Sequence, residues 1–75
     1  MPWNRNNRLV ELGKRIRMLR LERGLVQEDF DDGTELGIAA RNVRQIEHGR
    51  KDVRISTLFK IAERLGVPVS DLLDE

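Results

Sequence analysis

The sequence contains no cysteine and only one histidine among its 75 residues. Disulfides, thiolate metal sites, clusters of metal ligands and a cysteine nucleophile are therefore excluded, and no cofactor or metal is expected. Glycine-rich phosphate loops are also absent, and neither the serines nor the paired acids have partners that suggest catalysis. We therefore expect a protein that is not an enzyme.

Long apolar runs are equally absent. No stretch approaches the ~20 apolar residues that span a bilayer, and the basic N-terminal residues are not followed by the apolar segment of a signal peptide. The lack of cysteine fits a reducing compartment. These observations predict a soluble, cytoplasmic protein with no membrane partner.

Hydrophobic residues make up 39% of the chain, which is enough for one compact core but not for a large one. We expect a single domain over residues 1–75, in which residues 1–6 form a flexible arm. Stability at this size is expected to come from close helix packing or from a partner subunit.

Charge is strongly segregated along the chain, although the net charge is only +1. Residues 1–24 carry seven basic and two acidic side chains, whereas residues 25–40 carry five acidic and no basic ones. Residues 41–54 are basic again, with five basic and two acidic side chains. A basic stripe, of the kind that nucleic-acid-binding proteins use, can therefore exist on a nearly neutral molecule.

Leucine and isoleucine recur at intervals of three and four near the N-terminus, at Leu9, Leu12, Ile16 and Leu19. This spacing predicts a helix over residues 7–23, capped at its start by Asn6 or Asn7 and ended by Gly24. A short second helix is predicted over residues 26–32. It cannot run far, because Phe30 and Leu36 would lie about 240° apart on a helix and Gly33 offers a stop.

Three further helices are predicted in the second half of the chain. The third covers residues 39–48, with Val43 and Ile46 facing inward and Gly49 ending it. The fourth is capped by Ser56, and a last short helix is capped by Ser70. The fourth helix places apolar residues at helical spacing, at Leu58, Ile61, Ala62 and Leu65. No strand pattern competes, so five helices with short connections predict an all-α bundle.

The third predicted helix has a polar face that suits DNA. Arg41, Arg44 and Gln45 lie opposite the apolar positions, and the small residues Ala39 and Ala40 stand at the helix start. Arginine pairs with guanine and glutamine with adenine through two hydrogen bonds each, and small residues let the backbone come close to a duplex. The alternative interpretation is an ordinary solvated helix face, which is common. Periodicity and composition alone leave both interpretations open.

The chain resembles the Cro/C1-type (Xre) helix-turn-helix family over roughly residues 9–73. The resemblance rests on LGKRIRMLRLERGLVQEDF (residues 12–30), LGIAARNVRQIEHG (residues 36–49) and STLFKIAERLGVPVSDLL (residues 56–73). The run Ile46-Glu47-x-Gly49 and the ending Leu65-Gly66-Val67 are specific in combination. The resemblance implies the five-helix lambda-repressor-like fold, with the helix-turn-helix at helices 2 and 3. It also implies a sequence-specific transcriptional regulator, a repressor or an activator, whose helix 3 enters the major groove of double-stranded DNA.

The resemblance also implies roles for single residues. Four match the family's base-reading positions, namely Ala40, Arg41, Arg44 and Gln45. Five match its phosphate-contacting positions, namely Gln27, His48, Arg50, Lys51 and Arg54. Gln27 also matches a residue that supports helix 3, and Glu47 matches a glutamate that holds the domain together by internal pairing. The alternatives are a simple helix-start residue for Gln27 and an exposed C-terminal histidine, favoured by the helix dipole, for His48.

Three departures from the family pattern surround helix 2. Five residues separate Phe30 from Leu36 where the family usually has three, and Asp31 stands where alanine usually packs against helix 3. Val26 and Ala39 replace the usual polar caps, and each lost cap costs about 1 kcal/mol. These departures bear on the geometry of helix 2 and on the depth of helix 3 in the groove.

The expected partners are a DNA operator and a second copy of the chain. A single short helix 3 reads few bases, so we expect a homodimer that reads two half-sites about one helical turn apart. The C-terminal apolar residues exceed what a small core needs, which places the expected dimer surface at Pro68, Val69 and Leu72. The acidic residues around helix 2 either solvate a loop or contact RNA polymerase, as in some phage repressors; they are Glu28, Asp29, Asp31 and Asp32. The alternative function is a protein-interaction module on the same fold, such as an antitoxin-like or polymerase-binding domain.

Overall fold

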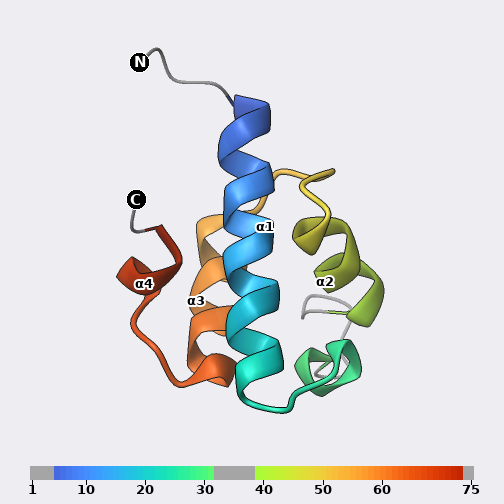
Figure 1. Ribbon diagram of the computed structural model, residues 1–75, viewed down its shortest axis with the longest axis vertical. Coiled ribbons are helices and arrows are strands. Elements are labelled where there is room, and N and C mark those ends of the chain that lie inside the picture. The colour runs from blue at the N-terminus through green and yellow to red at the C-terminus, as the bar shows by residue number, and fades with distance from the viewer. Residues whose placement is uncertain (1–4, 32–38, 74–75) are drawn as a thin grey trace.

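The computed structural model describes residues 5–31 and 39–73. They form an all-helical domain, in the order α1 (Arg5–Glu22), the 3-10 helix η1 (Gln27–Phe30), α2 (Ala40–Glu47), α3 (Ile55–Leu65) and α4 (Val69–Leu73). Figure 1 shows α1 running along the middle of the domain, with α2 and η1 on one side of it and α3 and α4 on the other. None of the helices described is long and apolar enough to cross a membrane.

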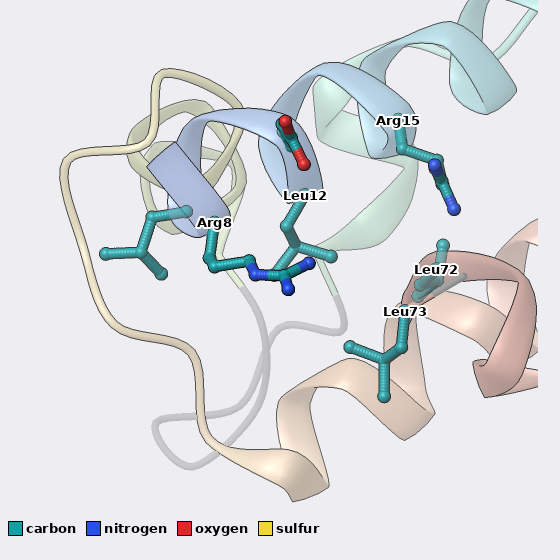
Figure 2. A pocket seen from close by; sticks show the side chains of 7 residues that line it. Arg8, Leu12, Arg15, Leu72 and Leu73 are labelled. Atoms are coloured by element: carbon teal, nitrogen blue, oxygen red, sulfur yellow. The ribbon is translucent and has the colours of Figure 1, made fainter. Parts of the chain in front are cut away.

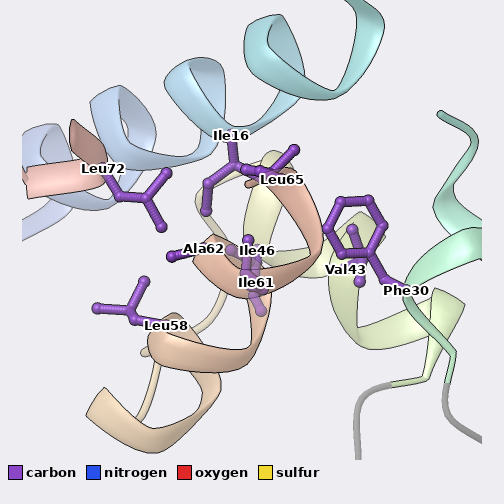
Figure 3. Packing of buried hydrophobic residues seen from close by; sticks show 9 residues of the cluster. All are labelled: Ile16, Phe30, Val43, Ile46, Leu58, Ile61, Ala62, Leu65 and Leu72. Carbon is purple, nitrogen blue, oxygen red and sulfur yellow. The ribbon is translucent and has the colours of Figure 1, made fainter. Parts of the chain in front are cut away.

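The core contains the apolar residues whose helical spacing the sequence displays. Nine side chains from all five elements form one buried cluster (Figure 3): Ile16, Phe30, Val43, Ile46, Leu58, Ile61, Ala62, Leu65 and Leu72. Leu12 and Leu19 are partly buried and pack against this cluster, as their place on the face of Ile16 predicts. The core therefore lies between α1 and the remaining elements, on the side of α2 that carries Val43 and Ile46.

The first helix begins earlier than expected. It starts at Arg5, so Arg5 and Asn6 belong to α1 instead of to an arm, and neither Asn6 nor Asn7 is its cap. Once a helix has formed, adding residues at its end costs little, because each further residue gains a backbone hydrogen bond. Gly24 ends this helix as predicted, with a left-handed φ of 66° and with the Leu25 N–H donating to the Arg20 carbonyl at 3.0 Å.

The second predicted helix is not an α-helix. Within residues 26–31, only the single 3-10 turn Gln27–Phe30 forms, and Asp31 is already extended. The all-α fold is confirmed, but the count of five helices is not, since the residues described form four α-helices and this 3-10 turn. The turn suffices to bury Phe30 in the core. Asp31 is exposed, so its charged side chain keeps contact with water.

The expected serine caps are also wrong. The N-cap of α3 is Arg54, whose backbone is extended and whose side chain makes no capping hydrogen bond. The Arg54 carbonyl accepts the first helical hydrogen bond from the Leu58 N–H at 3.0 Å, which places Ser56 inside the first turn. Similarly, α4 begins at Val69, so Ser70 is its second residue. Backbone geometry alone therefore starts both helices, without a side-chain oxygen.

Candidate nucleic-acid interface

The helix α2 separates a buried face from an exposed one. Val43, Ile46 and Glu47 are buried. With about 100° of rotation per residue, Arg41, Arg44 and Gln45 lie within about 60° of the direction opposite Val43 and Ile46. Arg41 and Arg44 are exposed, whereas Gln45 is half-buried. Three of the four side chains that are predicted to read bases therefore share the outer face of one helix.

Each end of α2 lies one residue inside the predicted range 39–48. Its N-cap, Ala39, is extended and makes no side-chain capping bond, and Ala40 follows as the first helical residue. Gly49 adopts a left-handed φ of 69°, and the Arg50 N–H donates back to the Gln45 carbonyl at 3.1 Å. The small residues Ala39 and Ala40 at the start are half-buried. The chain leaves the other end directly into the basic loop 50–54.

A buried ion pair fixes α2 against α1. The Glu47 carboxylate accepts two hydrogen bonds from Arg20, from Nε at 2.7 Å and from Nη2 at 3.0 Å. Arg20 Nη1 donates to the Leu25 carbonyl at 3.0 Å, so the guanidinium also anchors the segment that follows α1. The hydrogen bond to Glu47 raises the pKa of Arg20 above its ordinary value. The predicted internal pairing of Glu47 is confirmed.

Gln27 joins this ion pair to the exposed face of α2. Its Nε2 donates to Glu47 Oε1 at 3.2 Å, and its Oε1 accepts from Arg44 Nε at 3.4 Å. The predicted support of helix 3 by Gln27 is therefore present in the structure. Its predicted contact with phosphate stays a prediction.

The remaining predicted phosphate contacts lie after α2. His48, Arg50, Lys51 and Arg54 are all exposed, and three of them belong to the loop that joins α2 to α3. Lys51 Nζ donates to Asn42 Oδ1 at 3.0 Å, which holds this loop against the side of α2. Positive charge thus flanks the outer face of α2, which is predicted to read bases. A DNA backbone would run along these flanks if α2 entered a groove.

Sequence reasoning missed two residues of this site. Arg20 is the partner of Glu47, and Asn42 is the partner of Lys51. A signal for Arg20 existed, because it lies four residues after the core residue Ile16 and hence on the inward face of α1. Asn42 has no such signal, since the approach of the loop to α2 depends on the tertiary structure.

The predicted dimer surface is corrected in part. Leu72 is 2% exposed and belongs to the core of its own chain, so it is not available to a partner. The short helix α4 contacts α1 and α3 with one apolar face, and Leu72 lies on that face. Pro68 is exposed and Val69 is half-buried. The neighbouring Leu73 ends α4 and is 50% exposed. The sequence analysis assigns it no role.

The acidic side chains also receive definite places. Glu28, Asp29 and Asp31 are exposed on and after η1, which contacts α2. Asp29 Oδ2 accepts a hydrogen bond from the Val26 N–H at 2.8 Å and so replaces the missing polar cap of this turn. Asp32, the fourth residue of the predicted polymerase contact, lies outside the described residues.

A pocket of about 130 Å³ opens between α1 and α4 (Figure 2). Leu9, Leu12, Leu72 and Leu73 give it an apolar lining, and Arg8 and Arg15 stand at its sides. Arg15 Nη1 donates to the Asp71 carbonyl at 3.3 Å and so bridges the two helices. Figure 1 shows that α4 and α2 lie on opposite sides of α1, which separates this apolar pocket from the base-reading face.

The arrangement of α1, η1, α2 and the Glu47 ion pair defines a helix-turn-helix domain. The helix-turn-helix family matches residues 16–72, which is most of the chain. The chain belongs to this family, in its Cro/C1-type branch. No solved structure matches the chain significantly.

Three relatives illustrate the membership. The chain is 33% identical over 61 residues to the cryptic phage CTXphi transcriptional repressor RstR of Vibrio cholerae, a match that covers 81% of this chain and 53% of the repressor. It is 35% identical over 66 residues to an HTH-type transcriptional regulator of Sinorhizobium medicae, covering 88% and 46%. It is 31% identical over 62 residues to a further HTH-type regulator of Sinorhizobium fredii, covering 83% and 78%. The chain thus spans about half the length of the first two relatives.

Proposed function

We propose that the chain is a sequence-specific DNA-binding transcriptional regulator that inserts α2 into the major groove. The observation that carries this proposal is the outer face of α2, where Arg41, Arg44 and Gln45 project opposite a buried face that the Arg20–Glu47 pair holds in place. The names of the relatives, a repressor and two transcriptional regulators, support it. This function requires access to DNA, so we also propose that the protein works in the cytoplasm, without an enzymatic step.

The proposed contacts divide into base readout and phosphate binding. Arg41 and Arg44 suit the O6 and N7 acceptors of guanine, and Gln45 suits adenine. Ala40 can contact a thymine methyl or leave room for the duplex. His48, Arg50, Lys51 and Arg54 are proposed to bind phosphates and so to set the register of α2 along the groove.

Salt dependence of binding to a mixed-sequence duplex tests this function. Each neutralised phosphate contributes about −0.9 to the slope of log affinity against log salt, so Arg50, Lys51 and Arg54 predict about −3 per chain. Replacing Arg50 or Arg54 with alanine is expected to lower the magnitude of the slope by about 1 each. Arg64→Ala is the matched control, because it removes the same charge from the exposed side of α3 and is expected to leave the slope unchanged. Negligible binding at low salt would contradict the proposal.

A second candidate function is a protein-interaction module, and the acidic turn favours it. Glu28, Asp29 and Asp31 are exposed beside α2 and would repel phosphate if a duplex approached from that side. The same residues, with Asp32, are the proposed contact with RNA polymerase if the chain activates transcription. Measuring duplex affinity of Glu28→Gln separates the two cases. A higher affinity would indicate that Glu28 repels phosphate, whereas an unchanged affinity is expected if this surface binds a protein partner.

We also propose that two chains bind adjacent half-sites as a homodimer. A helix of eight residues reads few bases, so one copy alone gives limited specificity. With Leu72 buried, the proposed surface consists of Pro68, Val69 and the exposed Leu73 beside the α1–α4 pocket. Sedimentation of the chain alone and on operator-length duplex is expected to show a dimer at least on DNA. A monomer in both samples would contradict the dimer.

A further inference from the structure

We infer that Gln27 is a positioning residue for Arg44 and thereby sets a preference for guanine at one base step of the target. The inference rests on the proposed function, since it concerns how the base-reading face of α2 is organised. Its basis is a chain of hydrogen bonds that runs from the buried guanidinium of Arg20 through Glu47 and Gln27 to the exposed side chain of Arg44.

The Arg20–Glu47 pair, at the buried end of this series of hydrogen bonds, determines which way the Gln27 amide points. The Glu47 side chain is 2% exposed and, when ionised beside Arg20, can only accept hydrogen bonds. Gln27 must therefore present Nε2 to the carboxylate, because its carbonyl oxygen there would face another acceptor. The Oε1 atom is left facing outward, toward α2. The orientation of this amide is thus fixed by the ion pair and is not a free choice between two flips.

At the exposed end of this series of hydrogen bonds, Gln27 holds one edge of the Arg44 guanidinium. Arg44 Nε donates to Gln27 Oε1 at 3.4 Å, which leaves Nη1 and Nη2 as the fork for a ligand. A fork of two parallel N–H donors matches the O6 and N7 acceptors of guanine. Holding Nε restricts a long, exposed side chain before it meets DNA, so less rotamer freedom is lost on binding. Gln27 therefore acts on specificity through Arg44, without contacting a base.

Positioning of Arg44 by Gln27 and binding of phosphate by Gln27 predict different binding behaviour. Both polar atoms of the Gln27 side chain are engaged within the protein, and the residue is half-buried. A phosphate contact by Gln27 would strengthen binding to every sequence and steepen the salt slope. A positioning role instead affects only duplexes that offer guanine to Arg44. The two roles therefore predict different outcomes for one substitution.

A double-mutant cycle on two duplexes tests the inference. Selection from random duplexes by the wild-type chain identifies the preferred site, and Arg44→Ala identifies the base pair whose preference depends on Arg44. The wild type is expected to discriminate at that pair by about ten-fold or more, and Arg44→Ala to abolish the discrimination. Gln27→Met, which keeps the length of the side chain, is expected to reduce the discrimination by about three-fold or more, with the salt slope unchanged. In the Arg44→Ala background, Gln27→Met is expected to have no further effect on discrimination.

Three results would overturn the inference. Equal loss of affinity on both duplexes with a shallower salt slope would make Gln27 a phosphate contact. If folded Gln27→Met discriminates between the two duplexes as well as the wild type, Gln27 does not position Arg44. The same conclusion follows if Gln27→Met still lowers discrimination in the Arg44→Ala background. Absence of any duplex binding by the wild type would instead overturn the proposed function, and the inference would fall with it.

A second measurement covers the case in which Gln27→Met does not fold. In the free wild-type chain, the Nε–H proton of Arg44 is expected to exchange with water more slowly than that of Arg41, because only the former has a partner in Gln27. Arg44→Lys keeps the charge but lacks the planar fork, and it is expected to retain the salt slope while losing the guanine preference. Equal exchange of the two arginine protons would contradict the positioning role whatever the fate of the Gln27 variant.

Discussion

Gly13→Ala is expected to destabilise the protein strongly, although alanine is the better helix former by about 1 kcal/mol. Gly13 lies in the middle of α1, where that helix meets the end of α2. A Cβ atom at this position would stand 2.4 Å from the Ile46 carbonyl oxygen and 2.5 Å from that of Glu47. These are backbone atoms, so no rotamer change relieves the overlap and α2 must move. We expect a loss of about 3 kcal/mol in the free energy of unfolding.

Urea denaturation followed by circular dichroism measures this loss, with Gly24→Ala as the control. Gly24 has a φ of 66° but nothing within 4 Å of an added Cβ, so only its left-handed backbone opposes alanine. That penalty is about 1–2 kcal/mol. The expected order of stability is wild type, then Gly24→Ala, then Gly13→Ala. A Gly13→Ala chain as stable as the wild type would contradict the close contact of α1 with α2.

Breaking the Arg20–Glu47 pair is expected to have the second large effect. Arg20 is 8% and Glu47 6% exposed, so either residue left alone would carry a buried charge without its partner. Arg20→Met and Glu47→Leu are each expected to cost about 3–5 kcal/mol of stability. The double variant Arg20→Met/Glu47→Leu is expected to be more stable than either single variant, because no unpaired charge remains.

Urea denaturation of the wild type, the two single variants and the double variant gives the coupling free energy between Arg20 and Glu47. Strong non-additivity is expected, since the two side chains share two hydrogen bonds. Additive losses would mean that the two charges act independently and that the pair does not hold α2 in place. DNA binding by the double variant then tests whether Gln27 still orients Arg44 after losing its carboxylate partner.

The apolar pattern predicted most of the core, because helical spacing leaves little freedom in which residues face inward. Ile16, Val43, Ile46 and the apolar series of the fourth predicted helix are all buried. Gly24 and Gly49 were predicted to end helices, and both have the positive φ that such ends require. These features depend on local sequence, so local reasoning suffices for them.

The features that sequence reasoning missed depend on contacts between distant segments. A 3-10 turn replaces the second helix because Phe30 is already buried and Asp31 must remain hydrated, which only the packing against α2 decides. Leu72 was predicted at a dimer surface because the small core was expected to be filled without it. The partner of Glu47 is one of many basic residues, and 27 positions separate the two.

The base-reading face is an intermediate case. The placement of Arg41, Arg44 and Gln45 opposite the apolar positions follows from helix geometry and is seen in α2. The link from Gln27 to Arg44 does not follow from it, because 17 residues separate them and the link needs the buried carboxylate of Glu47. Sequence patterns thus predicted which side chains face outward, and the structure adds how one of them is held.

The central claim is that the outer face of α2 meets duplex DNA. Amide chemical shifts of the ¹⁵N-labelled chain, recorded during titration with a mixed-sequence duplex at low salt, test it most directly. The largest changes are expected in residues 40–45 and 48–54, with little change in α4. Changes confined to the face between α1 and α4, or no changes at all, would contradict the claim.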